Sequence, residues 1–119
     1  MEAGVLLRFG KPIVGRERQS LALFAETISY LTELRDKGTI TWFEPFMLEA
    51  ADYEEEVGFV LIKGPAEKIL ALREDERWLN LISKALVLAQ HVKVTTVRVG
   101  EAVTEQMDRV GKVYAELGI

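Results

Sequence analysis

The chain has 119 residues, of which 49% are hydrophobic and 29% charged, so it has the size and composition of one folded domain, which we expect to span residues 1–119. Its formal net charge is -4 and its Lys and Arg residues are scattered among acidic ones, which disfavours nucleic acid as a partner. No apolar run approaches the roughly 18 residues that a membrane-spanning helix needs. The absence of cysteine excludes disulfides, thiolate zinc sites and cysteine nucleophiles, and it makes the cytoplasm the expected location.

The N-terminal part of the chain predicts a strand followed by a long helix. Residues Ala3–Phe9 form a short apolar run that ends at Gly10 and Pro12, as a strand buried on both faces does. From Arg16 onward the apolar residues recur at steps of three and four, which is the spacing of an amphipathic helix. The helix is expected to end at Gly38, because glycine accepts the left-handed conformation of a helix stop. Its apolar stripe consists of Leu21, Phe24, Ile28, Leu31 and Leu34.

Two strands joined as a hairpin are expected next. Residues 39–49 are rich in β-branched and aromatic side chains, and Pro45 within them favours an edge strand, because proline cannot donate a hydrogen bond to a neighbouring strand. A polar and acidic connection follows at residues 51–56. Residues 57–64, VGFVLIKG, are apolar nearly throughout, which is typical of a central strand buried on both faces.

The C-terminal part is expected to hold a broken helix, a strand and a last helix. Gly64 and Pro65 open the broken helix, with proline at its first position, and the charged stretch Arg73–Arg77 divides it into two short helices. Residues His91–Val99 are mostly β-branched and predict the last strand. After Gly100, a narrow apolar stripe predicts a closing helix suited to packing against a partner surface. That stripe consists of Val103, Met107, Val110, Tyr114 and Leu117.

This order of elements predicts a ferredoxin-like α+β sandwich, with a split βαβ arrangement that repeats once, an antiparallel sheet and an added C-terminal helix. Helices in such a fold cover one face of the sheet, so the other face must be polar or buried. Here neither face is polar, because the first hairpin strand places Trp42 and Phe46 on one face and Phe43 and Met47 on the other. A single copy would expose an apolar patch, so we expect a homodimer whose two sheets pack face to face.

The element order, the two-faced apolar strands, the long helix after GKPIVGRE and the segment KGPAEKILAL resemble the dimeric α+β barrel superfamily. That superfamily includes the antibiotic-biosynthesis monooxygenase-like, muconolactone isomerase-like and EthD-like proteins, and the chain is most similar to small uncharacterised bacterial members. The resemblance covers nearly the whole chain and is one of pattern. It implies a pocket between each sheet and its helices or inside the dimeric barrel, used for small organic molecules without a metal or an organic cofactor. It implies no particular reaction.

Two charged residues stand inside strands that are otherwise apolar, where a charge must be paired, solvated or used. Arg8 shares strand parity with Leu6, and Glu44 shares it with Trp42 and Phe46, so all could face one aromatic cavity. On this hypothesis Arg8, Trp42, Glu44 and Phe46 bind the substrate, Arg8 orients an anionic or enolate oxygen, and Glu44 or His91 moves a proton. The alternative is a salt bridge at the rim of the dimer interface.

His91 is the only histidine, the residue type best suited to proton transfer near neutral pH. As a general base it would need a substrate proton within hydrogen-bond reach, and the alternative is an exposed histidine at the end of a strand. A lone histidine does not supply a multi-histidine metal site. We therefore expect no metal and no cofactor, and a heme- or metal-using relative is disfavoured.

The segment FGKPIVGRERQS, residues 9–20, raises the question of a phosphate-binding loop, because Gly10 and Gly15 have the required spacing between a strand and a helix. A phosphate loop continues with Lys and then Ser or Thr, whereas here Arg16 and Glu17 follow, and Pro12 removes a backbone donor. We interpret the segment as a strand-to-helix connection. The acidic run at residues 54–56 is too compact for a calcium loop, and no G-x-S-x-G motif supports a hydrolase.

Two functions remain open from the sequence. The first is a small-molecule-binding dimeric barrel, with cofactor-free mono-oxygenation or isomerisation as its chemistry. The second is a non-catalytic assembly or sensing module whose sheet face and last helix bind protein partners. A concave pocket that contains Arg8 and Glu44 would favour the first function, and a filled barrel with both charges outside would favour the second.

Overall fold

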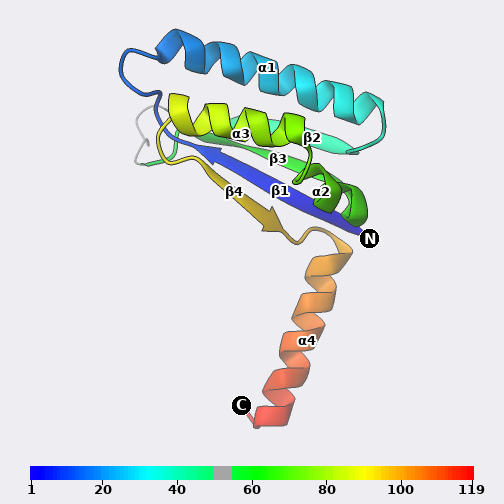
Figure 1. Ribbon diagram of the computed structural model, residues 1–119. Coiled ribbons are helices and arrows are strands. Elements are labelled where there is room, and N and C mark those ends of the chain that lie inside the picture. The colour runs from blue at the N-terminus through cyan, green and yellow to red at the C-terminus, as the bar shows by residue number, and fades with distance from the viewer. Residues whose placement is uncertain (50–54) are drawn as a thin grey trace.

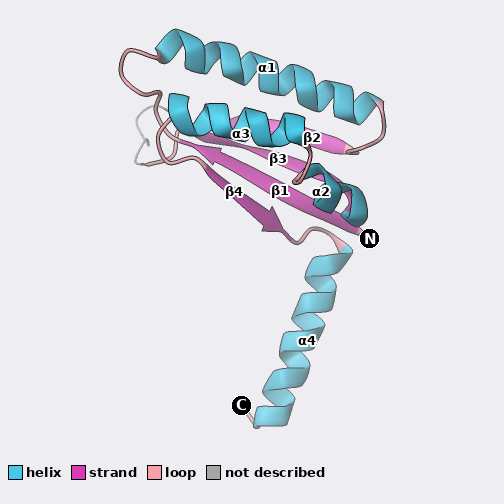
Figure 2. Cartoon of the chain, viewed as in Figure 1, coloured by secondary structure: helices cyan, strands magenta, loops and turns pink. Residues whose placement is uncertain are grey.

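The computed structural model describes residues 1–49 and 55–119 of the chain. Its elements, in chain order, are β1 (Glu2–Phe9), α1 (Glu17–Asp36), β2 (Trp42–Met47), β3 (Gly58–Pro65), α2 (Ala66–Leu72), α3 (Glu76–Leu88), β4 (Lys93–Val97) and α4 (Glu101–Leu117). Figure 1 shows α1, α2 and α3 on one side of the sheet and α4 running away from it, and Figure 2 separates the helices from the strands by colour. The predicted order of elements and the ferredoxin-like α+β class are confirmed.

The described strands form an antiparallel sheet in the order β2-β3-β1-β4. Leu6 of β1 is paired with Leu61 of β3 on one side and with Thr95 of β4 on the other, so the first strand lies inside the sheet. β2 and β3 form the predicted hairpin pair, and Pro45 lies in β2 at the edge, as predicted. The missing amide hydrogen of Pro45 therefore costs the sheet little.

The core lies between the sheet and the three helices on it, because successive residues of a strand point to opposite faces. Val5 and Leu7 of β1 point toward the helices and are buried, as are Val60 and Ile62 of β3. The helices complete this core with Leu23, Tyr30, Leu31, Leu34, Ile69, Leu72, Trp78 and Leu81.

Some predicted boundaries shift. Pro65 ends β3 and lies just before α2 rather than at its first position, because its ψ of 135° is extended. β2 begins at Trp42 rather than at Thr39, and β4 is shorter than the predicted strand. The helix break is confirmed: α3 begins after Asp75, whose side chain accepts a hydrogen bond from the backbone N–H of Arg77 at 3.1 Å.

The buried side of α1 includes most of the predicted stripe but not its first residue, Leu21. Leu23, Tyr30, Leu31 and Leu34 are its buried residues, whereas the predicted stripe residue Leu21 is 73% exposed. The reason is packing against α3, which selects one of the two apolar rows that overlap on this helix.

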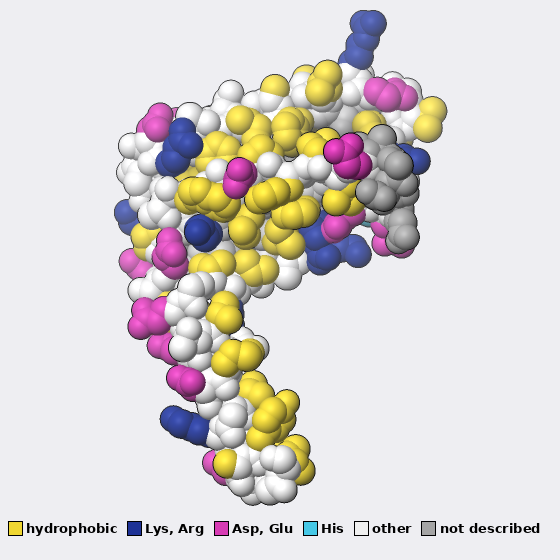
Figure 3. Space-filling model, turned by 180° about the vertical axis from the view of Figure 1, so that it is seen from behind, with side chains coloured by type: hydrophobic (Ala, Val, Ile, Leu, Met, Phe, Trp, Pro, Cys, Tyr) yellow, Lys and Arg dark blue, Asp and Glu magenta, His cyan; other side chains and the backbone are white. Residues whose placement is uncertain are grey.

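We call the sheet face opposite α1, α2 and α3 the open face. Cross-strand pairing places on it Trp42, Glu44 and Phe46 of β2, Phe59, Leu61 and Lys63 of β3, Gly4, Leu6 and Arg8 of β1, and Lys93, Thr95 and Val97 of β4. Figure 3, seen from behind, shows hydrophobic side chains gathered over the body of the molecule and continuing along one side of α4. The prediction that Trp42 and Phe46 share a face opposite Phe43 and Met47 is confirmed.

The last helix leaves the sheet at Gly100, whose φ of 55° and ψ of -123° are accessible to glycine rather than to residues with a side chain. Of the residues of α4, Ala102 is the buried one. None of the helices within the described part of the chain has the length and hydrophobicity needed to span a bilayer.

Candidate functional site

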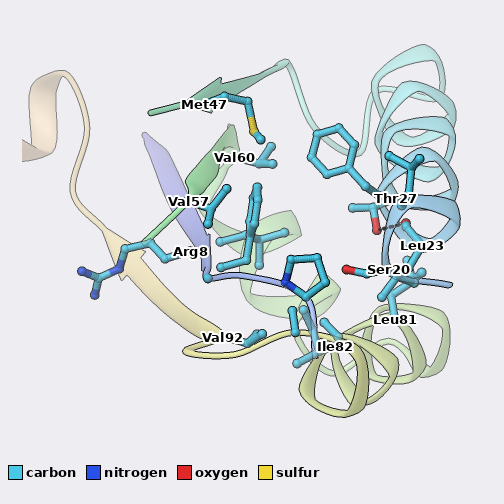
Figure 4. A pocket seen from close by; sticks show the side chains of 18 of the residues that line it. Arg8, Ser20, Leu23, Thr27, Met47, Val57, Val60, Leu81, Ile82 and Val92 are labelled. Carbon is cyan, nitrogen blue, oxygen red and sulfur yellow. Dashed lines mark hydrogen bonds between the residues drawn. The ribbon is translucent and has the colours of Figure 1, made fainter. Parts of the chain in front are cut away.

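A cavity of about 480 Å³ lies between the sheet and helices α1 and α3, at the end of β1. Its walls are apolar nearly throughout, and Figure 4 shows the side chains of α1 and α3 facing those of the sheet across it. The main lining side chains are Leu7, Phe9, Leu23, Phe24, Thr27, Tyr30, Met47, Val57, Val60, Trp78, Leu81, Ile82, Ala85 and Val92.

The cavity exists because large core residues meet small ones at this end of the fold. Ala85 and Ala89 on the α3 side and Ser20 at the start of α1 leave space that Phe9 and Phe24 do not fill. The rings of Phe9 and Phe24 meet edge to face, with centroids 5.8 Å apart, and form part of the wall.

The segment that raised the question of a phosphate loop closes one end of the cavity. The backbone N–H of Gly10 donates to the carbonyl oxygen of Gln90 at 2.7 Å, and that of Gln90 donates to Lys11 at 2.9 Å. A Cβ at Gly10 would lie 2.5 Å from the carbonyl oxygen of Glu55, so only glycine fits there. The N–H of Gly15 donates to the carboxylate of Glu17 at 2.9 Å, an arrangement that agrees with a structural connection.

Tyr30 is the buried polar residue of the wall, with 2% of its surface exposed. Its hydroxyl lies 3.4 Å from Oδ2 of Asp75, and burial first, then the negative charge of Asp75, raises the pKa of Tyr30 to about 12. The phenol therefore stays protonated at neutral pH, and its one proton is directed to Asp75. The guanidinium of Arg77 lies 4.7 Å from the centroid of the Tyr30 ring and also binds Glu33, with 2.7 Å between Nη1 and Oε2.

A second hydroxyl in the wall belongs to Thr27, which donates to the backbone carbonyl of Leu23 at 2.8 Å. Its lone pairs remain available as acceptors. The wall can thus offer hydroxyl oxygens as acceptors to a neutral molecule, among them those of Tyr30 and Thr27, which both lie on α1.

Arg8 lines the end of the cavity, but Figure 4 shows its guanidinium pointing away from the enclosed space. On the open face its Nε lies 3.4 Å from Oε1 of Glu56, and its Nη2 donates to Oγ1 of Thr95 at 3.4 Å. Arg8 is therefore paired, and its partner is Glu56 rather than Glu44. This geometry is an ion pair within one chain, and a position at the rim of a dimer interface stays a prediction.

Trp42, Glu44 and Phe46 share the open face with Arg8, as their strand parity predicts, and the enclosed cavity lies on the other side of the sheet. Phe46 stacks on Phe59 with ring centroids 4.9 Å apart, and Nζ of Lys63 lies 4.6 Å from the centroid of the Trp42 ring. Glu44 is exposed and lies opposite Leu61. A role for these residues as ligand contacts stays a prediction.

His91 is exposed and lies in the bend before β4 with a φ of 52°, a left-handed conformation uncommon for a residue other than glycine. Its neighbours Ala89 and Val92 line the cavity, and His91 is not among the lining residues. Its role as a general base stays a prediction.

Tyr30, Thr27 and Asp75 were missed by sequence reasoning. The spacing of Leu23, Thr27, Tyr30 and Leu34 follows steps of four, three and four, which would have placed the two hydroxyls on the buried side of α1. No sequence signal connects Tyr30 with Asp75, because their contact depends on how α1 and α3 pack.

Trp78 is buried, and it also lines the cavity. Among residues 1–49 and 55–119, no three His, Cys, Asp or Glu side chains gather in a way that would hold a metal ion. Glu54, the first residue of the acidic run, lies outside the described residues.

Comparisons with known proteins find no matching family model and no matching curated protein. Solved structures do match. A dimeric ferredoxin-like protein of unknown function from Jannaschia sp. CCS1 is 11% identical, with a TM-score of 0.64 over 83% of this chain and 100% of that one. SnoaB, a cofactor-independent oxygenase from Streptomyces nogalater, is 12% identical, with a TM-score of 0.55 over 83% and 93%.

An ethyl tert-butyl ether D (EthD) family protein from Bacillus halodurans C-125 is 8% identical, with a TM-score of 0.61 over 84% of this chain and 100% of that one. At these identities the likeness concerns the fold. The chain has a ferredoxin-like fold, and the resemblance seen in the sequence is confirmed at the level of the fold. About a sixth of this chain lies outside the matched part in each of these comparisons.

Proposed function

We propose that the protein is a cytoplasmic homodimer in which each subunit binds a small, neutral and largely apolar organic molecule in the cavity between the sheet and helices α1 and α3. The observation that carries this proposal is the cavity itself, whose volume of about 480 Å³ is within the range of ligand sites and whose apolar wall holds one protonated phenol.

The chemistry of the wall favours a neutral ligand. The guanidinium of Arg8 points away from the enclosed space, and the carboxylate of Glu17 is bound to the N–H of Gly15. A charged ligand would therefore lose its hydration without a partner in the wall, which is costly. A hydroxyl group on an otherwise apolar ligand would instead donate a hydrogen bond to the hydroxyl oxygen of Thr27.

The homodimer rests on the open face. Leu6, Phe59 and Leu61 are half-buried there and Phe46 is 39% exposed, so a single copy leaves an apolar surface at the centre of the sheet. A second copy packed on the same face would remove it from water. The dimeric state stated for the Jannaschia protein gives this part of the proposal its precedent.

Catalysis is the finer part of the proposal. SnoaB is described as a cofactor-independent oxygenase, and mono-oxygenation or isomerisation without a cofactor is the chemistry we propose to assay. Thr27 is the wall residue that would accept a hydrogen bond from a hydroxyl of a molecule in the cavity. Arg8, Glu44 and His91 are the proposed charged and proton-moving residues of a site between the sheets, to be tested with Arg8→Met, Glu44→Gln and His91→Asn.

The test uses Nile red, a neutral apolar dye whose fluorescence rises in apolar surroundings. Ala85→Trp fills the cavity from α3 and should weaken dye binding at least about tenfold, whereas Leu86→Trp, on the exposed side of the same helix, should leave binding unchanged. Thr27→Phe, which fills the cavity from α1, guards against misfolding of the first variant. Equal dye binding by all folded variants would contradict a ligand site in the cavity.

A second candidate function is the non-catalytic assembly or sensing module, favoured by the apolar side chains exposed along α4, among them Met107, Tyr114 and Leu117. It predicts that disrupting α4 or the open face changes assembly while cavity-filling substitutions change nothing. The dye experiment and a measurement of oligomeric state therefore separate the two functions.

A further inference from the structure

The apolar residues of α4 follow the spacing of a coiled-coil seam. Val103, Met107, Val110, Tyr114 and Leu117 are separated by steps of four, three, four and three, which is the alternation of the a and d positions of a heptad. A stripe this narrow is suited to another helix, whereas packing on a sheet or a broad core needs a wider apolar face. We call these five residues the α4 seam.

Charges are arranged so that a copy of the same helix can approach the seam. The positions that flank a seam are held here by uncharged residues, Thr104, Gln106, Gly111 and Val113. The charged residues of the helix all lie on the side away from the seam, and they are Glu101, Glu105, Asp108, Arg109, Lys112 and Glu116. Two copies of α4 would therefore meet without like charges facing each other.

The α4 seam is largely uncovered within one chain. Met107, Tyr114 and Leu117 are 57%, 52% and 66% exposed, and Figure 1 shows α4 leading away from the sheet and the other helices. Gly111, in the middle of the helix, has nothing within 4 Å of the place where its Cβ would be. Glycine inside a helix is unfavourable compared with alanine, and here it leaves room beside the seam for a close neighbour.

The seam continues the surface proposed to pair in the dimer. Hydrophobic side chains run from the body of the molecule along one side of α4 in the same view (Figure 3). Gly100 sets the direction of α4 relative to β4, which places the helix beyond the edge of the sheet rather than over it. With 17 residues, or roughly 25 Å, α4 is too short to associate alone, so its pairing belongs with another contact between the same two copies.

We propose that α4 packs against α4 of a second copy of this chain through the α4 seam, next to the pairing of the open faces. This pairing does not depend on the ligand of the cavity. Like the proposed function, it requires a second copy of the chain, and in that respect it rests on the proposed homodimer. The experiments below therefore use variants in α4 that leave the sheet unchanged.

Because the chain has no cysteine, one introduced cysteine is the sole thiol of each copy, and any disulfide that forms joins two copies through it. Val110 lies close to the midpoint of α4, so it faces its own counterpart in a parallel pair, and in a centred antiparallel pair it lies about one turn from it. Val110→Cys should form an intermolecular disulfide rapidly under mild oxidation, seen on non-reducing gels. Lys112→Cys, on the outer side of the same helix, is the matched control and should crosslink at least about tenfold more slowly. Equal rates for the two variants would overturn the proposal.

A second pair of variants measures the contribution of the seam to association. Val110→Glu places a carboxylate in the seam and should raise the dissociation constant measured by sedimentation equilibrium at least about tenfold, whereas Lys112→Glu should not. Circular dichroism confirms that both keep their helix. If Val110→Glu dissociates the protein while Val110→Cys fails to crosslink, α4 covers another part of the second copy and the helix pair is refuted. If Leu61→Glu in the open face dissociates the dimer and the α4 variants do not, α4 pairing is refuted and the sheet contact stands.

Discussion

The hydroxyl of Tyr30 in α1 lies 3.4 Å from Oδ2 of Asp75. The same carboxylate oxygen accepts a hydrogen bond from the backbone N–H of Arg77, in the first turn of α3. One carboxylate thus caps one helix and contacts the other, and these two helices form one side of the cavity. The shape of the cavity near Tyr30 depends on this contact between segments that are far apart in the sequence.

Replacing Tyr30 by Phe should change how stability depends on pH. An unperturbed tyrosine loses its proton near pH 10, whereas Tyr30 in the folded protein keeps it until about pH 12. Between these values the unfolded chain releases the proton and the folded chain does not, so the free energy of unfolding falls as pH rises. In urea unfolding between pH 8 and pH 11.5, Tyr30→Phe should lack this part of the fall in the free energy of unfolding. Near neutral pH the substitution should lower the free energy of unfolding by about 1 kcal/mol, because the hydrogen bond to Asp75 is lost. Tyr114→Phe, at an exposed site, should keep the wild-type slope, and three parallel curves would contradict the assignment.

The two roles of Asp75 can be separated by two substitutions. Asp75→Ala removes both the cap of α3 and the charge beside Tyr30, and should lower the free energy of unfolding by about 1 kcal/mol through the lost cap alone. Asp75→Asn keeps a capping oxygen and should cost less, while the pKa of Tyr30 falls in both variants because the charge is gone. Thermal unfolding measures the first effect and ultraviolet titration of the phenol the second. Equal destabilisation by the two variants would argue against the cap.

Placing a charge at the centre of the open face should separate the subunits. Leu61→Glu should be monomeric at concentrations where the wild type is dimeric, because a buried unpaired carboxylate is costly. Ala25→Glu, on the exposed side of α1, is the matched control and should remain dimeric. Sedimentation velocity at several concentrations gives the answer, and a dimeric Leu61→Glu protein would exclude the open face as the interface.

Gly10→Ala should destabilise the protein by about 1–3 kcal/mol, because the new Cβ would lie 2.5 Å and 2.8 Å from the carbonyl oxygens of Glu55 and Gln90. The close approach there holds the β1–α1 connection against the segment after α3, so the variant should also bind Nile red more weakly. Chemical denaturation provides the measurement. An unchanged midpoint would show that the connection moves freely to make room.

The order of the elements was predictable because each has a local signal. Examples are Pro45 for the edge strand, the charged stretch Arg73–Arg77 for the helix break and Gly100 for the start of the last helix. The parity of Arg8, Glu44 and Trp42 was also right, since alternation along a strand is strict. Which face the helices cover was not predictable, because both faces of β1, β2 and β3 carry apolar residues. The cavity consequently lies on the side away from Glu44, and Tyr30 acquires its place in the wall from packing between α1 and α3.

The position of β1 bears on how the chain reaches this fold. β1 is made first, yet its two neighbours are β3 and β4, which lie much later in the sequence. Each of its edges must therefore close a long loop before it gains a partner, and such non-local pairings slow folding. During synthesis β1 can pair with β3 once that strand is made, but its other edge stays unpaired until β4 has left the ribosome. The seconds during and just after synthesis are thus when this protein is most exposed to aggregation, and coexpressed chaperones should raise its yield.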